Sequence, residues 1–451
     1  MPERLHAPGS GSDVAVHSSE ASARAARRAR MLLVALIVLG LTVRLALVFV
    51  MPEGKAAPTP DAWASLRIGR SLAAGEGFVL PAEPHADEDR LRAEGSGLAA
   101  ETRVSQRLAD RTPGYPLMVA AALRLAEQGL RLLAVSQAGI GAIAMALAAY
   151  LAWRLAGVWA AAAAAALLVF DPYQVYACTL VLPLVPLGFV LVALAGAGLR
   201  FIDASKQGGR AWPWAALAGL FAAGAVYLDW RMAGLAVVIG VAALIAPGRR
   251  RYLVGWAVGL AVLVVALAPW VVRNTIRLGQ PVLTTSLGAS LYEGACDSLS
   301  PRDVVLKDVR VEAADKLEET ARNDLYLAAA EKVIAGDPLG WLGRVTHRAA
   351  EIWSPWPLRE SGGLPLPPVA GYTSLLPAGA LALVGVWTLR RRPAVLVWLL
   401  AAPVYVTIAG AVLAGGVEDR LPLAPTLAIL GGAGLAAMIT RPGVEKEKQP
   451  G

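Results

Sequence analysis

Ten apolar runs of roughly 15 to 22 residues recur along the 451-residue chain and constrain its fold more than any other feature. A helix that crosses about 30 Å of hydrocarbon needs about 20 such residues, and within lipid a helix pairs its own backbone polar groups. With 56% hydrophobic and 17% charged residues, the chain is too apolar for a soluble globular protein. We therefore expect an all-α polytopic membrane protein with about ten transmembrane helices, at residues 31–50, 132–153, 157–171, 180–199, 212–228, 232–247, 252–272, 373–389, 394–414 and 421–439.

Residues 114–130 are ambiguous, because they are apolar but short and are interrupted by Arg124. If this stretch lies along the interface instead of crossing the bilayer, all basic clusters fall on one face, as the positive-inside rule requires. The clusters are at Arg24, Arg27, Arg28 and Arg30, at Arg154, at Arg200, Lys206 and Arg210, at residues 249–251 and 390–392, and at Arg441, Lys446 and Lys448. We expect a multi-pass protein of the inner (cytoplasmic) membrane with both termini cytoplasmic.

This topology divides the chain into five parts and places two long segments outside the membrane. The parts are a disordered cytoplasmic tail at 1–30, an N-terminal transmembrane module at 31–272 that includes the first outer loop at 51–131, a second outer loop or small domain at 273–372, C-terminal transmembrane helices at 373–440, and a cytoplasmic tail at 441–451. We expect amphipathic interfacial helices in both outer segments.

A single carboxylate, Asp61, opens a helix-like segment about ten residues beyond the first span. In this segment Ala62, Leu66 and Gly69 share one face, as in a helix that lies along the interface. Asp is also among the preferred helix N-cap residues, so a capping role is the simpler interpretation. The two roles are compatible, and the pattern alone leaves both open.

Arginines accompany helix-breaking residues at two other places in the outer segments. Arg111 opens the sequence "RTPGYP", and Arg273 and Arg277 lie one helical turn apart after Trp270 in "PWVVRNTIRLGQP". An arginine suits a phosphate because its planar guanidinium can donate two hydrogen bonds at once. An arginine that extends to the lipid headgroups or to water is the ordinary alternative for each of them.

The order of these motifs resembles the polytopic glycosyltransferases of the C superfold. The residues concerned are "PDAWASLRIGRSLAAGEGF", "RTPGYPLMVAAAL", "PWVVRNTIRLGQPVLTTSLGASLY", the amphipathic segment at 326–353, and "EDRLPLAPTLAIL". The most similar branch is the bacterial one related to dolichyl-phosphate-mannose protein mannosyltransferases (glycosyltransferase family 39) and to lipid A aminoarabinose transferases. The likeness runs in order from Met31 to Thr440.

The resemblance implies that Asp61 is the catalytic carboxylate, and that Arg111 and Arg273 are the basic residues of the site. We expect the substrate to be bound by Arg111, Tyr115, Arg231, Trp270, Arg273, Asn274 and Arg277. The chain also departs from the family pattern. Ala62 and Ser65 stand where the family often has a second acid and a tyrosine, and Pro183 stands near the place of a further acid.

The expected function is transfer of a sugar from a polyprenyl phosphate-linked donor to an acceptor hydroxyl at the outer face of the membrane. The expected partners are the lipid bilayer, this donor, and a protein, lipid or polysaccharide acceptor. The basic residues sit in short clusters between apolar runs, so nucleic acid is not expected. No metal site is indicated by the Cys and His spacing; the lipid-linked sugar is a co-substrate, and a role for a divalent ion is left open.

Two other classes of function are compatible with a polytopic helical chain. A lipid or solute transporter or flippase would place ionisable groups at the membrane midplane, and Arg44 is the clearest internal charge. A catalytically inactive scaffold of the same fold would use its second outer segment to bind a partner.

Overall fold

The computed structural model describes residues 11–52, 59–80, 108–245, 249–296, 318–355 and 369–439. These residues form helices, and no strand is found among them. The tail at 441–451 and residues 81–107 of the first predicted outer loop lie outside the described residues. The elements are α1 (Gly11–Val50), α2 (Pro60–Ala74), α4 (Gly114–Leu125), α5 (Gly129–Ala156), α6 (Val158–Val169), α7 (Pro172–Ala177), α8 (Leu184–Lys206), α9 (Trp212–Leu228), η2 (Trp230–Gly234), α10 (Leu235–Ile245), α11 (Arg249–Leu278), α12 (Leu287–Ala295), α15 (Glu319–Gly336), α16 (Pro338–Ile352), α17 (Val369–Leu389), α18 (Pro393–Val412), η3 (Val417–Leu423) and α19 (Ala424–Ile439).

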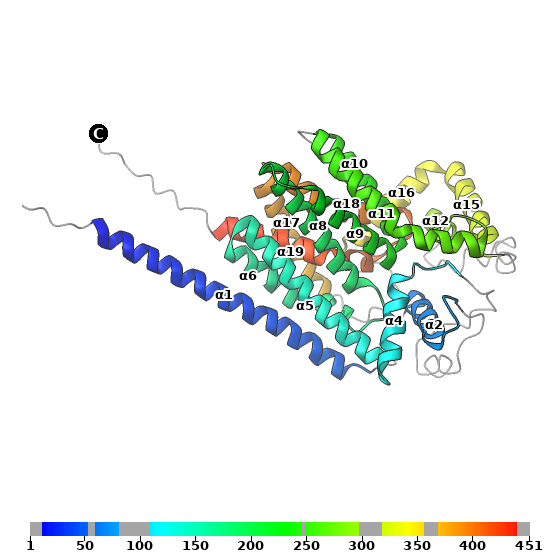
Figure 1. Cartoon of the computed structure of the whole chain (residues 1–451), viewed down its shortest axis with the longest axis horizontal. Coiled ribbons are helices and arrows are strands. Elements are labelled where there is room, and N and C mark those ends of the chain that lie inside the picture. The colour runs from blue at the N-terminus through cyan, green and yellow to red at the C-terminus, as the bar shows by residue number, and fades with distance from the viewer. Residues whose placement is uncertain are drawn as a thin grey trace, which may run out of the picture.

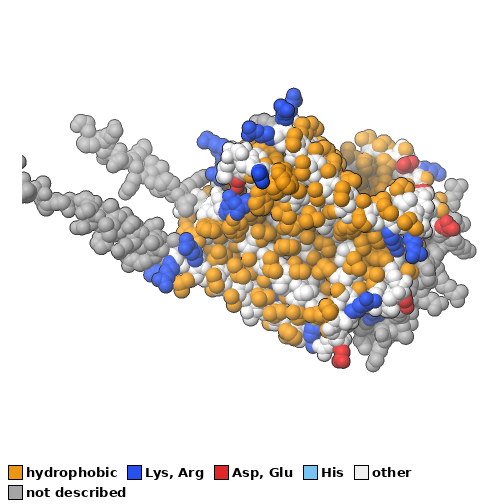
Figure 2. Space-filling model, in the orientation of Figure 1, with side chains coloured by type: hydrophobic (Ala, Val, Ile, Leu, Met, Phe, Trp, Pro, Cys, Tyr) orange, Lys and Arg blue, Asp and Glu red, His pale blue; other side chains and the backbone are white. Residues whose placement is uncertain are grey.

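The all-α polytopic fold is confirmed. Among the described residues, six helices are long and apolar enough to cross a membrane, and they begin at Arg30, Gly129, Leu184, Arg249, Pro393 and Val417. Four shorter apolar helices, at Val158–Val169, Trp212–Leu228, Trp230–Leu244 and Ser374–Leu389, coincide with the other predicted spans. Figure 2 shows a broad hydrophobic surface across the middle of the molecule, with charged side chains toward its two ends.

The helix α4 is the ambiguous stretch of the sequence. It has 12 residues, which gives a length of about 18 Å, and like α6 it is one of the shorter apolar helices. The chain leaves the helical conformation at Ala126 and begins the next helix, α5, at Gly129. The stretch predicted to remain outside the spans is therefore a separate short helix.

Two expectations about the N-terminal part need correction. The helix α1 begins at Gly11, so most of the segment predicted as a disordered tail at 1–30 continues the first span as helix. The helix α2 was expected to turn only one face to the protein, but Arg67 and Ser71 are buried as well as Leu66. It is buried on several sides because α4 packs against it.

Small side chains allow the central helices to approach closely. The alanines 160–165 of α6 are all buried, and α6 packs against α19. A methyl group on Gly432 of α19 would lie 2.3 Å from the carbonyl oxygen of Ala160, so only glycine fits there. Such small-residue contacts are typical of helix packing in membranes.

The basic clusters meet at one end of the bundle. Arg154 at the end of α5 forms an ion pair of 2.7 Å with Asp203 of α8. Arg251 at the start of α11 donates to the carbonyl oxygen of Ser205, also in α8. Figure 1 places the start of α1 and the end of α19 toward this end, and α2, α4, α12 and α15 at the other end. The two segments predicted to lie outside the membrane therefore come together, away from the basic clusters.

Candidate active site

Asp61 lies in the first turn of α2, where the local sequence fixes its position. Thr59 is the N-cap, and its side chain accepts a hydrogen bond from the backbone N–H of Ala62 at 3.2 Å. Pro60 occupies the first helical position, which favours helix initiation. The predicted capping role of Asp61 is therefore wrong, because Thr59 performs it. The carboxylate of Asp61 is left free to point away from the helix.

The partner of Asp61 is Arg111, which belongs to the same predicted outer loop, residues 51–131. Its guanidinium forms a hydrogen-bonded ion pair with Asp61 and lies 3.5 Å from the carboxylate of Asp110. The Asp61 side chain is 57% exposed and that of Arg111 is 29% exposed, so this pair is accessible from outside the protein. The two residues predicted as catalytic acid and phosphate ligand are thus in direct contact.

Opposing effects act on the pKa of Asp61. Crowding by the surrounding protein favours the neutral acid, but the charge and hydrogen bond of Arg111 and the more distant charge of Arg231 outweigh it. The pKa of Asp61 therefore lies below its ordinary value, and the group is an anion at neutral pH. The pKa of Arg111 is raised: desolvation opposes the increase, but Asp61 and Asp110 outweigh it.

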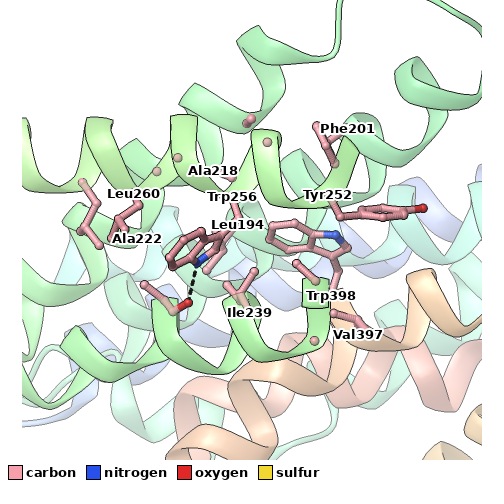
Figure 3. A pocket seen from close by; sticks show the side chains of 18 of the residues that line it. Leu194, Phe201, Ala218, Ala222, Ile239, Tyr252, Trp256, Leu260, Val397 and Trp398 are labelled. Atoms are coloured by element: carbon pink, nitrogen blue, oxygen red, sulfur yellow. Dashed lines mark hydrogen bonds between the residues drawn. The ribbon is translucent and has the colours of Figure 1, made fainter. Parts of the chain in front are cut away.

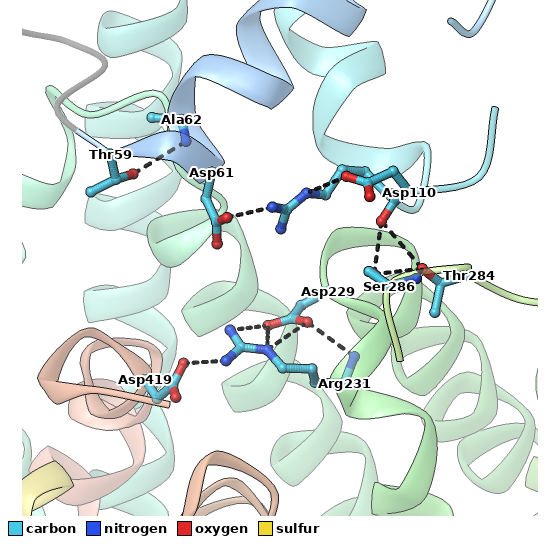
Figure 4. Close-up of polar contacts among 10 residues, drawn as sticks. Thr59, Asp61, Ala62, Asp110, Asp229, Arg231, Thr284, Ser286 and Asp419 are labelled. Atoms are coloured by element: carbon cyan, nitrogen blue, oxygen red, sulfur yellow. Dashed lines mark hydrogen bonds and ion pairs between the residues drawn. The ribbon is translucent and has the colours of Figure 1, made fainter. Parts of the chain in front are cut away.

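A second ionic group, formed by Asp229, Arg231 and Asp419, faces Asp61 (Figure 4). Arg231 donates to both carboxylate oxygens of Asp229 at 2.8 to 3.1 Å, and its Nη1 lies 2.8 Å from Asp419. Asp229 ends α9, whereas Asp419 belongs to η3, 190 residues later in the chain. The fold alone brings these groups to one site.

A buried carboxylate holds the loop that carries Arg111. Glu319, the first residue of α15, accepts hydrogen bonds from the backbone N–H groups of Leu108 and Ala109 and from the hydroxyl of Thr285. Ser286 also donates to the carbonyl oxygen of Asp110 at 2.9 Å. The second outer segment therefore sets the position of Arg111.

Arg273 holds the same loop from α11. Its guanidinium donates to the carbonyl oxygens of Leu108 at 2.6 Å and of Phe78 at 3.0 Å, and lies over the rings of Phe78 and Trp270. These contacts occupy part of the guanidinium that was predicted to bind the donor phosphate. Arg273 is thus separate from the Asp61–Arg111 pair but connected to it through residues 108–111.

Three other predicted residues point into the protein. The hydroxyl of Tyr115 lies 3.3 Å from both Gln137 and the carbonyl oxygen of Leu180, and the side chain is 1% exposed. Trp270 and Asn274 are buried and donate to carbonyl oxygens of residues 282–283. These contacts support the chain around the site, and substrate binding by the three residues stays a prediction.

Arg277 is exposed near the C-terminal end of α11, one turn beyond Arg273. The structure therefore brings together Asp61, Arg111 and Arg231, and leaves Arg277 at the rim. Asp110, Asp229 and Asp419 also belong to the site, although the sequence did not single them out for chemistry. The available signal was their position, because each adjoins a basic residue or a predicted outer turn.

No group of His, Cys, Asp and Glu side chains suited to holding a metal ion occurs in the described part of the chain. At the site itself, Asp229 and Asp419 are already bonded to Arg231. The arrangement provides an accessible anion, Asp61, between two guanidinium groups. It can accept a proton at Asp61 and bind an anionic group at Arg111.

An apolar cavity of about 70 Å³ lies elsewhere, among α8, α9, α10, α11 and α18 (Figure 3). Leu194, Ile239, Leu260 and Trp398 contribute to its lining, and Trp256 donates its indole N–H to the carbonyl oxygen of Ala236. The described residues that line it include no acidic or basic side chain. The cavity is suited to hydrocarbon and is distinct from the charged groups around Asp61.

No protein-family model and no curated protein sequence matches the chain. Solved structures of similar fold are found. The archaeal oligosaccharyltransferase AglB from Archaeoglobus fulgidus, in complex with an inhibitory peptide and a dolichol-phosphate, matches with a TM-score of 0.54 and 12% identity over 90% of this chain and 50% of that chain. The Archaeoglobus fulgidus oligosaccharyltransferase tethered with an acceptor peptide matches with a TM-score of 0.52 and 14% identity, over 90% and 49%.

ArnT from Cupriavidus metallidurans bound to undecaprenyl phosphate gives a TM-score of 0.40 and 15% identity, over 89% of this chain and 77% of that chain. The chain spans about half the length of the oligosaccharyltransferases. At these identities the likeness concerns the fold. It agrees with the resemblance suggested by the sequence as far as the fold is concerned: the chain shares the fold of the Archaeoglobus fulgidus oligosaccharyltransferases.

Proposed function

We propose that this protein is a membrane glycosyltransferase that uses a polyprenyl phosphate-linked sugar and acts at the outer face of the cytoplasmic membrane. The observation that carries the proposal is the contact between Asp61 and Arg111 at the end of the bundle that bears the outer segments. It places a proton acceptor beside an anion-binding group. The similar fold of an oligosaccharyltransferase that binds a dolichol-phosphate supports this choice of donor.

In the proposed reaction, the carboxylate of Asp61 accepts the proton of an acceptor hydroxyl as the hydroxyl oxygen bonds to the anomeric carbon of the sugar. The bond between that carbon and the phosphate oxygen breaks, and its electron pair leaves with the polyprenyl phosphate. Arg111 stabilises this leaving group through charge-assisted hydrogen bonds. A positioned general base typically contributes about 10² to 10⁴-fold to the rate.

An outer site explains the need for a lipid-linked donor. Nucleotide sugars are not supplied on that side, whereas a polyprenyl phosphate carries its sugar through the membrane. The ion pair is accessible while its supporting residues Glu319 and Asn274 are buried. A bound headgroup could therefore reach Arg111 without disturbing the residues that hold the loop.

The internal charge that favoured a transporter has a structural explanation. Arg44 of α1 is 2% exposed, and its guanidinium donates to the carbonyl oxygens of Gly40 at 2.9 Å and of Leu168 at 3.1 Å. It thereby joins α1 to α6 within the helix bundle. The groups suited to chemistry lie instead at the end formed by α2, η2 and η3, which favours an enzyme.

The direct test in cells is mass spectrometry of surface glycans and glycolipids. We expect a strain that lacks the chain to lose one sugar modification, the wild-type gene to restore it, and Asp61→Asn to fail. The matched control is Asp203→Asn, which removes the acid of another exposed ion pair at the opposite end of the bundle. Restoration by Asp61→Asn, at equal amounts in the membrane, would remove Asp61 from the mechanism.

A further inference from the structure

The two guanidinium groups that face Asp61 are held in different ways. Arg111 contacts Asp61 and Asp110 from the end of a loop, and both Arg111 and Asp61 are partly exposed. Exposed ion pairs contribute little stability, so this contact can be exchanged at small cost. An incoming phosphate can therefore draw Arg111 away from Asp61.

Arg231 cannot be exchanged in this way. Asp229 binds its Nε and Nη2, and Asp419 binds its Nη1, so carboxylates hold both sides of the guanidinium. Its backbone is fixed too, because Tyr405 donates its hydroxyl proton to the carbonyl oxygen of Arg231 and accepts from the N–H of Gly234 at 3.1 Å. A phosphate would have to break several charge-assisted bonds to recruit it.

The difference between Arg111 and Arg231 matters because acidic groups outnumber the arginines around Asp61. Among the described residues, five carboxyl groups and two guanidinium groups interact in this cluster: Asp61, Asp110, Asp229, Glu418 and Asp419 with Arg111 and Arg231. A donor phosphate adds negative charge and withdraws Arg111. Asp61 would then take up a proton and could no longer act as a base, unless another cation stayed beside it.

We infer that the two arginines divide the work: Arg111 moves from Asp61 to the donor phosphate, and Arg231 remains as the fixed counter-charge that keeps Asp61 ionised. This inference rests on the proposed function and deepens it, since Arg231 was predicted only as a substrate ligand. Arg231 is a positioning residue in this scheme because it acts through Asp61. Asp229 and Asp419 are in turn the residues that hold Arg231.

Two glycines leave space for the carboxylate of Asp419 beside Arg231. A methyl group on Gly415 would lie 1.8 Å from Oδ2 of Asp419, and one on Gly410 would lie 2.9 Å from the same atom. The carboxylate of Asp419 therefore occupies space that only glycines leave open. Burial acts to raise the pKa of Asp61, the charge and hydrogen bond of Arg111 lower it, and the charge of Arg231 adds a smaller lowering.

The experiment titrates Asp61 in the full-length protein in phosphatidylcholine nanodiscs, with and without a short-chain polyprenyl phosphate. The carboxylate band of Asp61 is isolated by infrared difference against Asp61→Asn, and lipid affinity is measured on the same samples. We expect the lipid to raise the titration midpoint in the wild type, and to raise it further in Arg231→Gln. Arg231→Lys, which keeps the charge, should return the midpoint toward the wild-type value.

Arg111→Gln should weaken binding of the lipid phosphate roughly tenfold or more, and its lipid-bound midpoint should be no lower than that of the wild type. Arg154→Gln, at the opposite end of the bundle, should change neither quantity. The inference is overturned by the following result: Arg231→Gln weakens lipid binding as much as Arg111→Gln does, and leaves the lipid-bound titration midpoint of Asp61 at the wild-type value. The titration needs no sugar, so a wild-type protein that titrates as expected but transfers nothing would contradict only the proposed function.

Discussion

Replacement of Glu319 by alanine should loosen the loop that carries Arg111. Glu319 is 6% exposed and accepts three hydrogen bonds, from Leu108 at 2.6 Å, Ala109 at 2.9 Å and Thr285 at 2.5 Å. Hydrogen bonds to a charged group contribute about 1.5 to 3 kcal/mol each, but neighbouring bonds are not additive. We expect Glu319→Ala to lower the free energy of unfolding by about 3 to 5 kcal/mol.

The assay combines denaturant unfolding in detergent with hydrogen exchange of the backbone amides at 108–111. The Leu108 and Ala109 amides lose their acceptor in the variant, so they should exchange faster, and sugar transfer should fall because Arg111 is no longer held in place. Glu331→Ala is the control, since Glu331 is an exposed acid on the same helix, α15. A Glu319→Ala protein with the stability and exchange rates of Glu331→Ala would refute the reasoning.

Three further predictions concern the site. Gly415→Ala should displace Asp419 from Arg231 and reduce sugar transfer at least about tenfold. Gly139→Ala is the control, because a methyl group added there meets nothing within 4 Å; equal transfer rates per folded protein for the two variants would contradict the role of Gly415. Because the pKa of Asp61 is lowered and the base acts as the anion, kcat/KM should fall only as the pH drops below the ordinary carboxyl range. Arg111→Gln should move that fall to higher pH, and an unchanged pH profile of kcat/KM would show that Arg111 does not act on Asp61. Tyr115→Phe should cost about 0.5 to 1.5 kcal/mol of stability and leave the KM for the donor unchanged, since the hydroxyl contacts Gln137 and Leu180; a raised KM would instead support substrate binding.

The spans could be predicted because their signal is local. Apolar length sufficed to find α5, α6, α8, α9, α10, α11, α17, α18 and α19. The start of α1 could not be found in this way. Residues 11–30 are polar, and they form one continuous helix with the hydrophobic residues that follow. No helix-breaking residue separates the two parts.

The site was less predictable because it depends on long-range contacts. Asp61 and Arg111 were identified from motifs, but their mutual contact joins residues 50 positions apart. Arg231 was named without its partner Asp419, which lies on η3 far along the chain. Arg273 illustrates the opposite case: its type and position suggested phosphate binding, whereas its bonds to Leu108 and Phe78 appear only in the folded chain.

The central claim is that Asp61 removes a proton from an acceptor while a sugar leaves its lipid phosphate. The most direct measurement uses purified protein in proteoliposomes supplied with a panel of polyprenyl phosphate sugars that carry labelled sugar and labelled lipid. We predict that the wild type releases polyprenyl phosphate together with sugar transfer, and that Asp61→Asn binds the donor but releases neither product above background. Transfer by Asp61→Asn at the wild-type rate, with the fold intact, would contradict the account.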